Sequence, residues 1–186
     1  MKLVAACAFG LETPVKWELQ QLGYEPRVIS PGRVQFDGDW KDICRTNIWL
    51  RVADRVLIEI ASFDAPDFDA LFETIKAMDW KQWLPNDAKF PVTARTRNSK
   101  LTSLPAIQRS SKKAIVESLQ KSYSTTLLPE TGGEYRIDVV LLDDKATLNL
   151  DTSGASLHKR GYRRSFGEAP ITVSYTHLTL PTTPYV

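Results

Sequence analysis

Two spacings of apolar residues follow one another along the chain and predict a fold of the α+β class. Lys2 to Ala8 is an almost unbroken apolar run, which is typical of a buried strand. Leu11, Val15, Leu19 and Leu22 then recur at near-helical spacing, so a helix with one buried face is expected next. The first 22 residues therefore already combine a strand with a helix.

Capping and turn residues predict where the elements of the first lobe begin and end. Thr13-Pro14 is typical of a helix start, with the hydroxyl at the cap and proline at the first helical position. Gly23 is typical of a helix end. Asp37 or Asp39 can cap a second helix, and Pro31-Gly32 predicts a turn between two strands. The order strand, helix, strand, strand, helix, strand indicates a ferredoxin-like lobe, with the later strands expected at 27–30, 33–36 and 55–63.

The rest of the chain predicts a second α/β domain. Asp67 is expected to cap a helix, and a strand at 90–96 follows it. A long helix from about Leu104 to Tyr123 carries Pro105 in its first turn. Asp143-Asp144 predicts a tight hairpin between two final strands. The order helix, strand, helix, strand, strand indicates a domain with a mixed sheet and a long basic helix.

Charge is segregated along the chain although the net charge is only +2. Residues 89–121 hold eight basic residues and one acidic residue, and residues 158–164 hold four basic residues and no acidic one. Such islands favour a polyanion as the binding partner. The alternative is that both are ordinary solvated segments, because charge runs usually mark exposed chain.

The first island predicts a phosphate-contacting surface. Helical spacing puts three of its cations on one helix face, near the end that favours anions. The candidates in this island are Arg95, Arg97, Lys100, Arg109, Lys112 and Lys113. Only Glu117 is available locally to balance them. The second island adds Lys159, Arg160, Arg163 and Arg164 around Gly161-Tyr162, a small set of phosphate and base contacts.

Other kinds of site find little support in the residues. The chain has two histidines and two cysteines without metal-ligand spacing, so no metal site is predicted. Cys7 and Cys44 are both expected to be reduced core residues of a cytoplasmic protein. No nucleotide-binding or hydrolase motif occurs, and no apolar run is long enough for a membrane helix. The five tryptophans lie away from the basic islands, and we expect most of them to belong to the core or to a lobe interface: Trp17, Trp40, Trp49, Trp80 and Trp83.

A series of short motifs, in register from residue 1 to about 172, resembles a known family. The motifs are Phe9–Glu12, Gly32–Phe36, Leu50–Arg55, Phe90–Val92, Gln108, Lys112–Glu117, Leu150–Gly154, Leu157–Arg163 and Ala169–Ile171. Together they resemble the N-terminal half of bacterial THUMP-containing class I RNA methyltransferases, which are similar to the 23S ribosomal RNA guanine-N2 methyltransferases.

The resemblance implies a domain organisation. It implies a ferredoxin-like lobe at residues 1–65 and a THUMP RNA-binding core at 66–154, with family signature starting near residue 44. Residues 155–172 would then link to a methyltransferase domain that is missing. Residues 173–186 have no charge and no helical period, and they resemble translated adapter sequence, so we expect them to be foreign and unstructured.

The resemblance also implies a function. The fragment would bind structured RNA, ribosomal RNA in particular, and position it for a catalytic domain that uses S-adenosylmethionine, while itself binding no cofactor and catalysing nothing. Two alternatives remain open: a stand-alone RNA-binding module, and the delivery domain of an enzyme that modifies tRNA or rRNA by other chemistry. Duplex DNA is a further, weaker alternative as the substrate.

Overall fold

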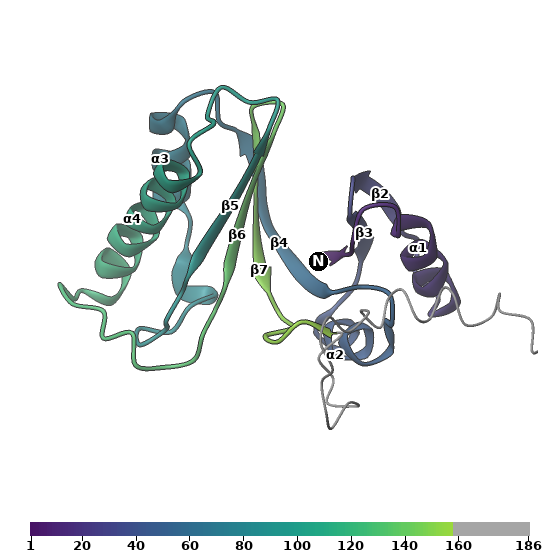
Figure 1. Ribbon diagram of the computed structural model, residues 1–186. Helices are drawn as coiled ribbons and strands as arrows, with labels where there is room; N and C mark the ends of the chain where they lie inside the picture. Colours follow the sequence, from purple (N-terminus) through teal and green to yellow (C-terminus); the bar gives the residue numbers. More distant parts are fainter. Residues whose placement is uncertain (158–186) are drawn as a thin grey trace, which may run out of the picture. The chain divides into compact units, whose positions relative to one another are not determined.

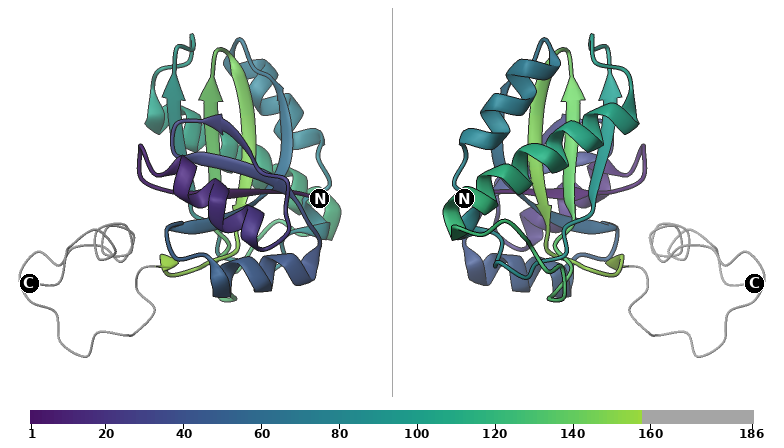
Figure 2. Two further views of the ribbon diagram at one scale, coloured as in Figure 1. Left: turned by 90° about the vertical axis from the view of Figure 1, so that its right-hand side faces the viewer. Right: turned by 90° about the vertical axis from the view of Figure 1, so that its left-hand side faces the viewer.

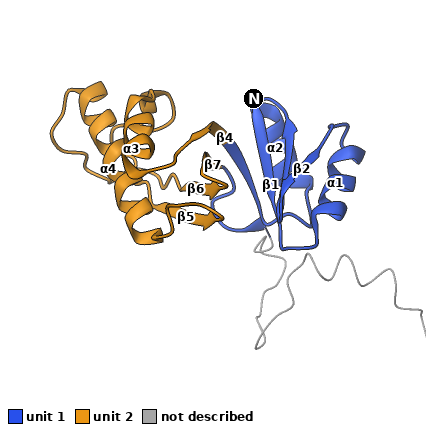
Figure 3. Ribbon diagram, turned by 90° about the horizontal axis from the view of Figure 1, so that it is seen from above, with its two compact units in different colours: residues 1–58, 152–186 blue, residues 59–151 orange. Residues whose placement is uncertain are grey.

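The computed structural model describes residues 1–157 of the 186-residue chain (Figure 1). These residues form two compact units, which Figure 3 colours separately. Unit 1 contains residues 1–58 and the described residues after Asp151, and unit 2 contains residues 59–151. Both units combine helices with a sheet, so the expected α+β class is confirmed.

Unit 1 has the βαββαβ order that the apolar pattern predicts. Its strands lie in the order β2-β3-β1-β4, and the pairs β2–β3, β3–β1 and β1–β4 are antiparallel. Val15 and Leu19 of α1 and Val34 and Phe36 of β3 are buried, which places this core between helix and sheet. The elements are β1 (Lys2–Ala6), α1 (Glu12–Gln21), β2 (Arg27–Ser30), β3 (Arg33–Asp37), α2 (Trp40–Trp49) and the first residues of β4 (Arg55–Asp64).

The start of α1 differs from the expectation. The helix begins at Glu12 with Leu11 at the N-cap, so Thr13 does not cap it. The Glu12 carboxylate instead accepts hydrogen bonds from the backbone N–H groups of Gly32, at 2.6 Å, and Gly10, at 3.3 Å. These bonds, the one from Gly32 first, hold the pKa of Glu12 below its usual value.

The start of α2 follows a stronger local signal. Asp39 caps this helix, and its side chain accepts from the N–H groups of Lys41 and Asp42. The Asp42 side chain accepts from the N–H of Asp39 in return, at 2.8 Å, which completes a capping box. Of the two expected caps, Asp39 rather than Asp37 is therefore used.

Unit 2 has the predicted order of helices and strands. Its strands follow the order β4-β7-β6-β5, with β6 antiparallel to β7 and parallel to β5, so its sheet is mixed. The helices α3 and α4 cover one face of this sheet, as the right-hand view of Figure 2 shows. The elements are α3 (Phe68–Ala77), a short 3-10 helix (Trp80–Gln82), β5 (Val92–Arg97), α4 (Leu104–Tyr123), β6 (Ile137–Leu142) and β7 (Lys145–Asp151).

Two local expectations in unit 2 are confirmed at residue level. Asp67 caps α3 by accepting from the N–H of Ala70 at 2.8 Å. Asp143 and Asp144 both have positive φ, 51° and 60°, which is the backbone conformation of a tight two-residue hairpin turn.

The chain returns to unit 1 after β7. The N–H of Thr152 donates to the carbonyl of Val56 at 3.1 Å, and the N–H of Leu157 donates to the carbonyl of Asp54 at 2.8 Å. Arg55 donates to the carbonyl of Gly154 at 2.7 Å. Thr152–Leu157 thus close unit 1 with residues that are about a hundred positions away in the sequence.

Candidate nucleic-acid interface

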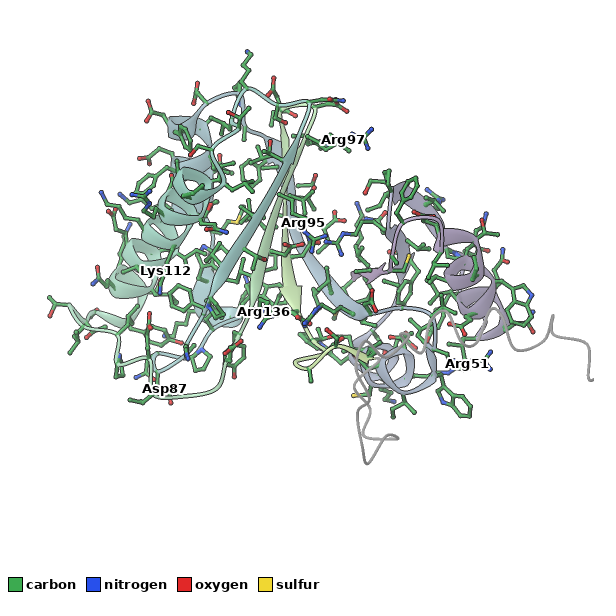
Figure 4. All side chains as sticks on the ribbon, viewed as in Figure 1. Arg51, Asp87, Arg95, Arg97, Lys112 and Arg136 are labelled. Carbon is green, nitrogen blue, oxygen red and sulfur yellow. The ribbon has the colours of Figure 1, made fainter. Side chains whose placement is uncertain are left out.

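The six candidate cations of the first basic island divide between two faces of unit 2. Arg95 and Arg97 are exposed and alternate on β5 with Ala94, which is buried on the helix side. Figure 4 shows both arginines projecting away from α4, whereas Lys112 lies on that helix. The island therefore does not form one continuous surface, because successive side chains of a strand point to opposite faces of the sheet.

The sheet-face arginines differ in their surroundings. The Nε of Arg95 lies 3.7 Å from a carboxylate oxygen of Asp138 on β6. Thr93 donates to the same oxygen from its hydroxyl at 2.9 Å. Arg97, at the end of β5, is exposed and has no acid partner among the described residues. It is thus the more available of the two for a phosphate.

The lysines of α4 are paired with acids but remain accessible. Lys112 Nζ lies 3.0 Å from Glu130, and its side chain is 44% exposed. Lys113 Nζ lies 3.8 Å from Glu117 and its side chain is 71% exposed. Exposed pairs of this kind contribute at most about 1 kcal/mol, so a phosphate can displace either acid.

Glu117 is shared between two helices. Besides Lys113 it accepts from Lys76 of α3 at 2.8 Å. This hydrogen bond lowers the pKa of Glu117 and raises the pKa of Lys76. Because Lys76 makes the shorter contact, Glu117 neutralises Lys113 only in part. The basic face of α4 is therefore more positive than its sequence-local acid suggests.

Aromatic rings lie beneath the same lysines. Lys112 Nζ is 5.5 Å from the ring centre of Phe90, and Lys113 Nζ is 5.7 Å from that of Phe72. These distances are typical of cation–π contacts. The rings attract the two ammonium groups weakly and so help to position them on the helix surface.

The other two predicted cations lie towards the start of α4. Arg109 is exposed, and its Nε donates to the carbonyl of Pro105 in the preceding turn at 3.2 Å. Lys100 lies in the β5–α4 loop, where its backbone N–H donates to Asp144 at 2.7 Å. That aspartate leaves the loop less positive than α4 itself.

The second basic island lies outside the described residues. This applies to Lys159, Arg160, Arg163 and Arg164, which stay predictions from the sequence. The structure adds one participant that the sequence pattern missed, Glu130. It lies in the loop after α4, 18 positions beyond Lys112, so no helical spacing connects the two.

The tryptophans correct another expectation. Trp80 is fully buried and donates from its indole N–H to the carbonyl of Ile75 at 2.7 Å, as a core residue should. Trp17, Trp40 and Trp49 are 55%, 63% and 63% exposed, so these three are not core residues. Apolar spacing failed to place them because all three lie on helices whose inner faces are occupied by other side chains.

Among the described residues neither cysteine belongs to a metal site, and Cys44 is exposed rather than buried in the core as expected. Within residues 1–157, no cluster of three or more His, Cys, Asp or Glu side chains could hold a metal ion. Burial raises the pKa of the Cys7 thiol to about 12, which keeps it protonated and unreactive at neutral pH. None of the described helices is both long and apolar enough to cross a membrane.

Comparison with known families matches the two units separately. Residues 2–57 match the RlmL ferredoxin-like domain, and residues 65–151 match the THUMP domain. The first match covers most of unit 1 and the second covers nearly all of unit 2, including α4 with its lysines.

Individual relatives point the same way. The chain is 47% identical over 171 residues to YpsC of Bacillus subtilis (strain 168), which is named as a candidate RNA methyltransferase. It is 29% identical over 178 residues to ribosomal RNA large subunit methyltransferase K/L of Psychrobacter cryohalolentis. The solved structure of SMU.472, a methyltransferase-like protein complexed with SAH, superposes with a TM-score of 0.87 at 40% identity.

The matched part is less than half of each relative. The chain spans 44% of YpsC, 23% of the K/L enzyme and 49% of SMU.472, while 91%, 92% and 99% of the chain itself are covered. Together the two domain matches show that residues 2–57 belong to the RlmL ferredoxin-like domain family and residues 65–151 to the THUMP domain family, and the chain is similar to part of several proteins named as methyltransferases.

Proposed function

We propose that the chain is the RNA-binding and substrate-positioning part of a longer methyltransferase, and that it carries no catalytic site of its own. The observation that carries the proposal is the THUMP match over residues 65–151, which includes the exposed lysines of α4. A polyanion contacting this face would replace Glu130 and the shared Glu117 as the partner of two prepositioned cations.

The remainder of the whole protein would supply the chemistry. S-adenosylmethionine is its proposed cofactor, since SMU.472 was solved with SAH, the product of methyl transfer. Ribosomal RNA is the proposed substrate, in keeping with the name of the K/L relative, and guanine N2 is the proposed target atom. We propose a cytoplasmic location for the whole protein, in keeping with ribosomal RNA as its substrate.

The proposed RNA contacts are the candidates from both basic islands. Those on α4 are Arg109, Lys112 and Lys113, and those on the sheet side are Arg95 and Arg97 with Lys100 in the adjoining loop. The cations beyond residue 157 stay in the proposal on their sequence alone: Lys159, Arg160, Arg163 and Arg164.

Competition binding tests the ligand class. A folded ribosomal RNA fragment labelled with a fluorophore should bind the 186-residue chain, and unlabelled folded RNA should displace it at much lower concentration than duplex DNA of equal length. Equal competition by the two would remove the RNA preference from the proposal.

Calorimetry tests the absence of a cofactor site in the chain. Titration with S-adenosylmethionine should give no heat of binding beyond dilution. A saturable heat would mean that the chain itself contains a cofactor site.

A further inference from the structure

The helix α2 of unit 1 is inverted with respect to ordinary packing. Its only buried side chain is Thr46, whose hydroxyl donates to the carbonyl of Asp42 at 2.7 Å. Trp40, Ile48 and Trp49 are 63%, 65% and 63% exposed. A surface helix normally buries its apolar side chains and exposes its polar ones.

The exposed side chains form two adjacent rows that together cover about half of the helix circumference. Positions 40, 44 and 48 follow one another at intervals of four, and positions 41, 45 and 49 form the neighbouring row. Cys44, Lys41 and Arg45 complete the rows, and all three are exposed. Ile48 and Trp49 are neighbours in these rows and Trp40 lies about two turns before Ile48, so three large apolar side chains, interspersed with Lys41 and Arg45, are exposed on one short helix.

Exposed apolar side chains are concentrated in this unit. Of the large apolar side chains that are exposed among residues 1–157, eight belong to unit 1 and three to unit 2. A docking surface for a protein is therefore to be sought on unit 1 rather than on the basic unit 2.

Charge argues against a nucleic acid as the occupant of α2. Asp39 and Asp42 balance Lys41 and Arg45 along the helix, so a polyanion gains no net attraction there. Arg45 also lies 5.7 Å from the ring centre of Tyr24, on the body of unit 1. The surface is thus apolar and close to neutral.

The route of the chain suggests which protein surface covers the helix. After β7, Thr152 and Ser153 are held on α2 by Asn47, whose amide nitrogen donates to the Thr152 hydroxyl at 3.0 Å and whose oxygen accepts from the Ser153 hydroxyl at 2.7 Å. The chain thus approaches its last described residues alongside this helix. The relatives extend over at least as many residues again as this chain matches.

We propose that the exposed face of α2 is the docking surface for the C-terminal catalytic domain of the whole protein, which covers it with an apolar surface of its own. This inference rests on the proposed function for the existence of that domain, but not on RNA binding by unit 2. The catalytic domain would be connected to a chain whose last described residues lie beside α2, so the contact is intramolecular. A modest apolar surface is then sufficient to hold it.

Hydroxyl-radical footprinting with mass spectrometry tests the proposal on the full-length protein encoded at the source locus. Trp40 and Trp49 should be oxidised several-fold more slowly in the full-length protein than in the 186-residue chain. Trp17 on α1, which is 55% exposed, should keep its rate. In a full-length Ile48→Lys/Trp49→Lys variant, Trp40 should recover the rate of the short chain, whereas Trp17→Lys should leave Trp40 protected.

Each other outcome overturns the docking proposal. Equal oxidation of Trp40 in both proteins would show that no domain covers α2. Protection that rises with concentration of the 186-residue chain would assign the surface to a second copy, and protection only on adding folded RNA would assign it to RNA. A locus that encodes no further domain would also end the proposal, whereas failure of the proposed RNA binding would appear only in the competition assay.

Discussion

Replacing Glu130 by Gln should make the chain bind folded RNA more tightly. The carboxylate of Glu130 lies 3.0 Å from Lys112 Nζ in the free protein, so a phosphate must displace this carboxylate to contact the lysine. Exposed pairs of this type contribute about 0.2–1 kcal/mol, so removing the competitor should lower the Kd by a factor of about 1.5 to 5. The substitution is isosteric and lies in a loop, so little loss of stability is expected.

The effect should also change the salt dependence. A lysine that is newly available to one phosphate steepens the slope of log affinity against log salt by at most about 0.9. The assay is fluorescence anisotropy with a labelled folded RNA at several salt concentrations, repeated for wild type and variant under the same conditions.

Glu134→Gln provides the matched control. Glu134 pairs with Arg136 at 3.1 Å in the same unit, so its replacement removes the same charge without releasing Lys112. If Glu130→Gln and Glu134→Gln tighten binding equally, net charge alone explains the gain and the local argument is refuted. Unchanged or weaker binding by Glu130→Gln would refute it as well.

Three further predictions concern the stability of unit 1. Asp39→Ala removes both hydrogen bonds that its side chain accepts at the start of α2 and should lower the free energy of unfolding by about 0.5–2 kcal/mol in urea titrations. Gly32→Ala should lower the melting temperature, because φ is +73° and an added Cβ would lie 2.7 Å from the carbonyl oxygen of Cys7. Glu12 contributes stability above its unfolded pKa of about 4.5 that is lost as pH falls through its lower folded pKa, so Glu12→Gln should flatten the acid side of the curve of melting temperature against pH. The contact concerned would be contradicted by an unchanged urea midpoint for Asp39→Ala, an unchanged melting temperature for Gly32→Ala, or an unchanged acid side of the curve for Glu12→Gln.

Much of the fold follows from signals that are local in the sequence. The helix α4 runs from Leu104 to Tyr123 as predicted, because Pro105 fits only its first turn and Ser124 adopts a left-handed conformation at its end. Asp39 and Asp67 cap their helices for the same local reason. Such features depend on residues that are at most a few positions apart.

The misplaced features depend on contacts that are distant in sequence. The true start of α1 is fixed by Glu12, whose main partner Gly32 is 20 positions away. Trp49 is exposed because α2 buries Thr46 and not its large apolar side chains. The spacing of apolar residues in this helix does not predict that orientation. No local pattern connects Thr152 with Val56, so the sequence does not predict the return of the chain to unit 1.

The candidate site shows the same division. Helical spacing correctly places Lys112 and Lys113 on the accessible surface of α4, because that spacing is a property of the helix itself. The sequence pattern does not predict Glu130, the acid partner that comes from a loop, or Lys76, the lysine of another helix that competes for Glu117. The sequence therefore predicts where cations lie better than it predicts how strongly they are neutralised.

The central claim is tested most directly by the salt dependence of RNA binding in a Lys112→Ala/Lys113→Ala variant. The matched control is Lys81→Ala/Lys145→Ala, which removes two exposed lysines of the same unit that lie outside α4 and are not among the proposed contacts. The first variant should bind folded RNA more weakly than the control, and its log–log salt slope should be flatter than wild type by up to about two. A slope that is unchanged, or that flattens equally in the control, would contradict the assignment of α4 as the RNA-binding face.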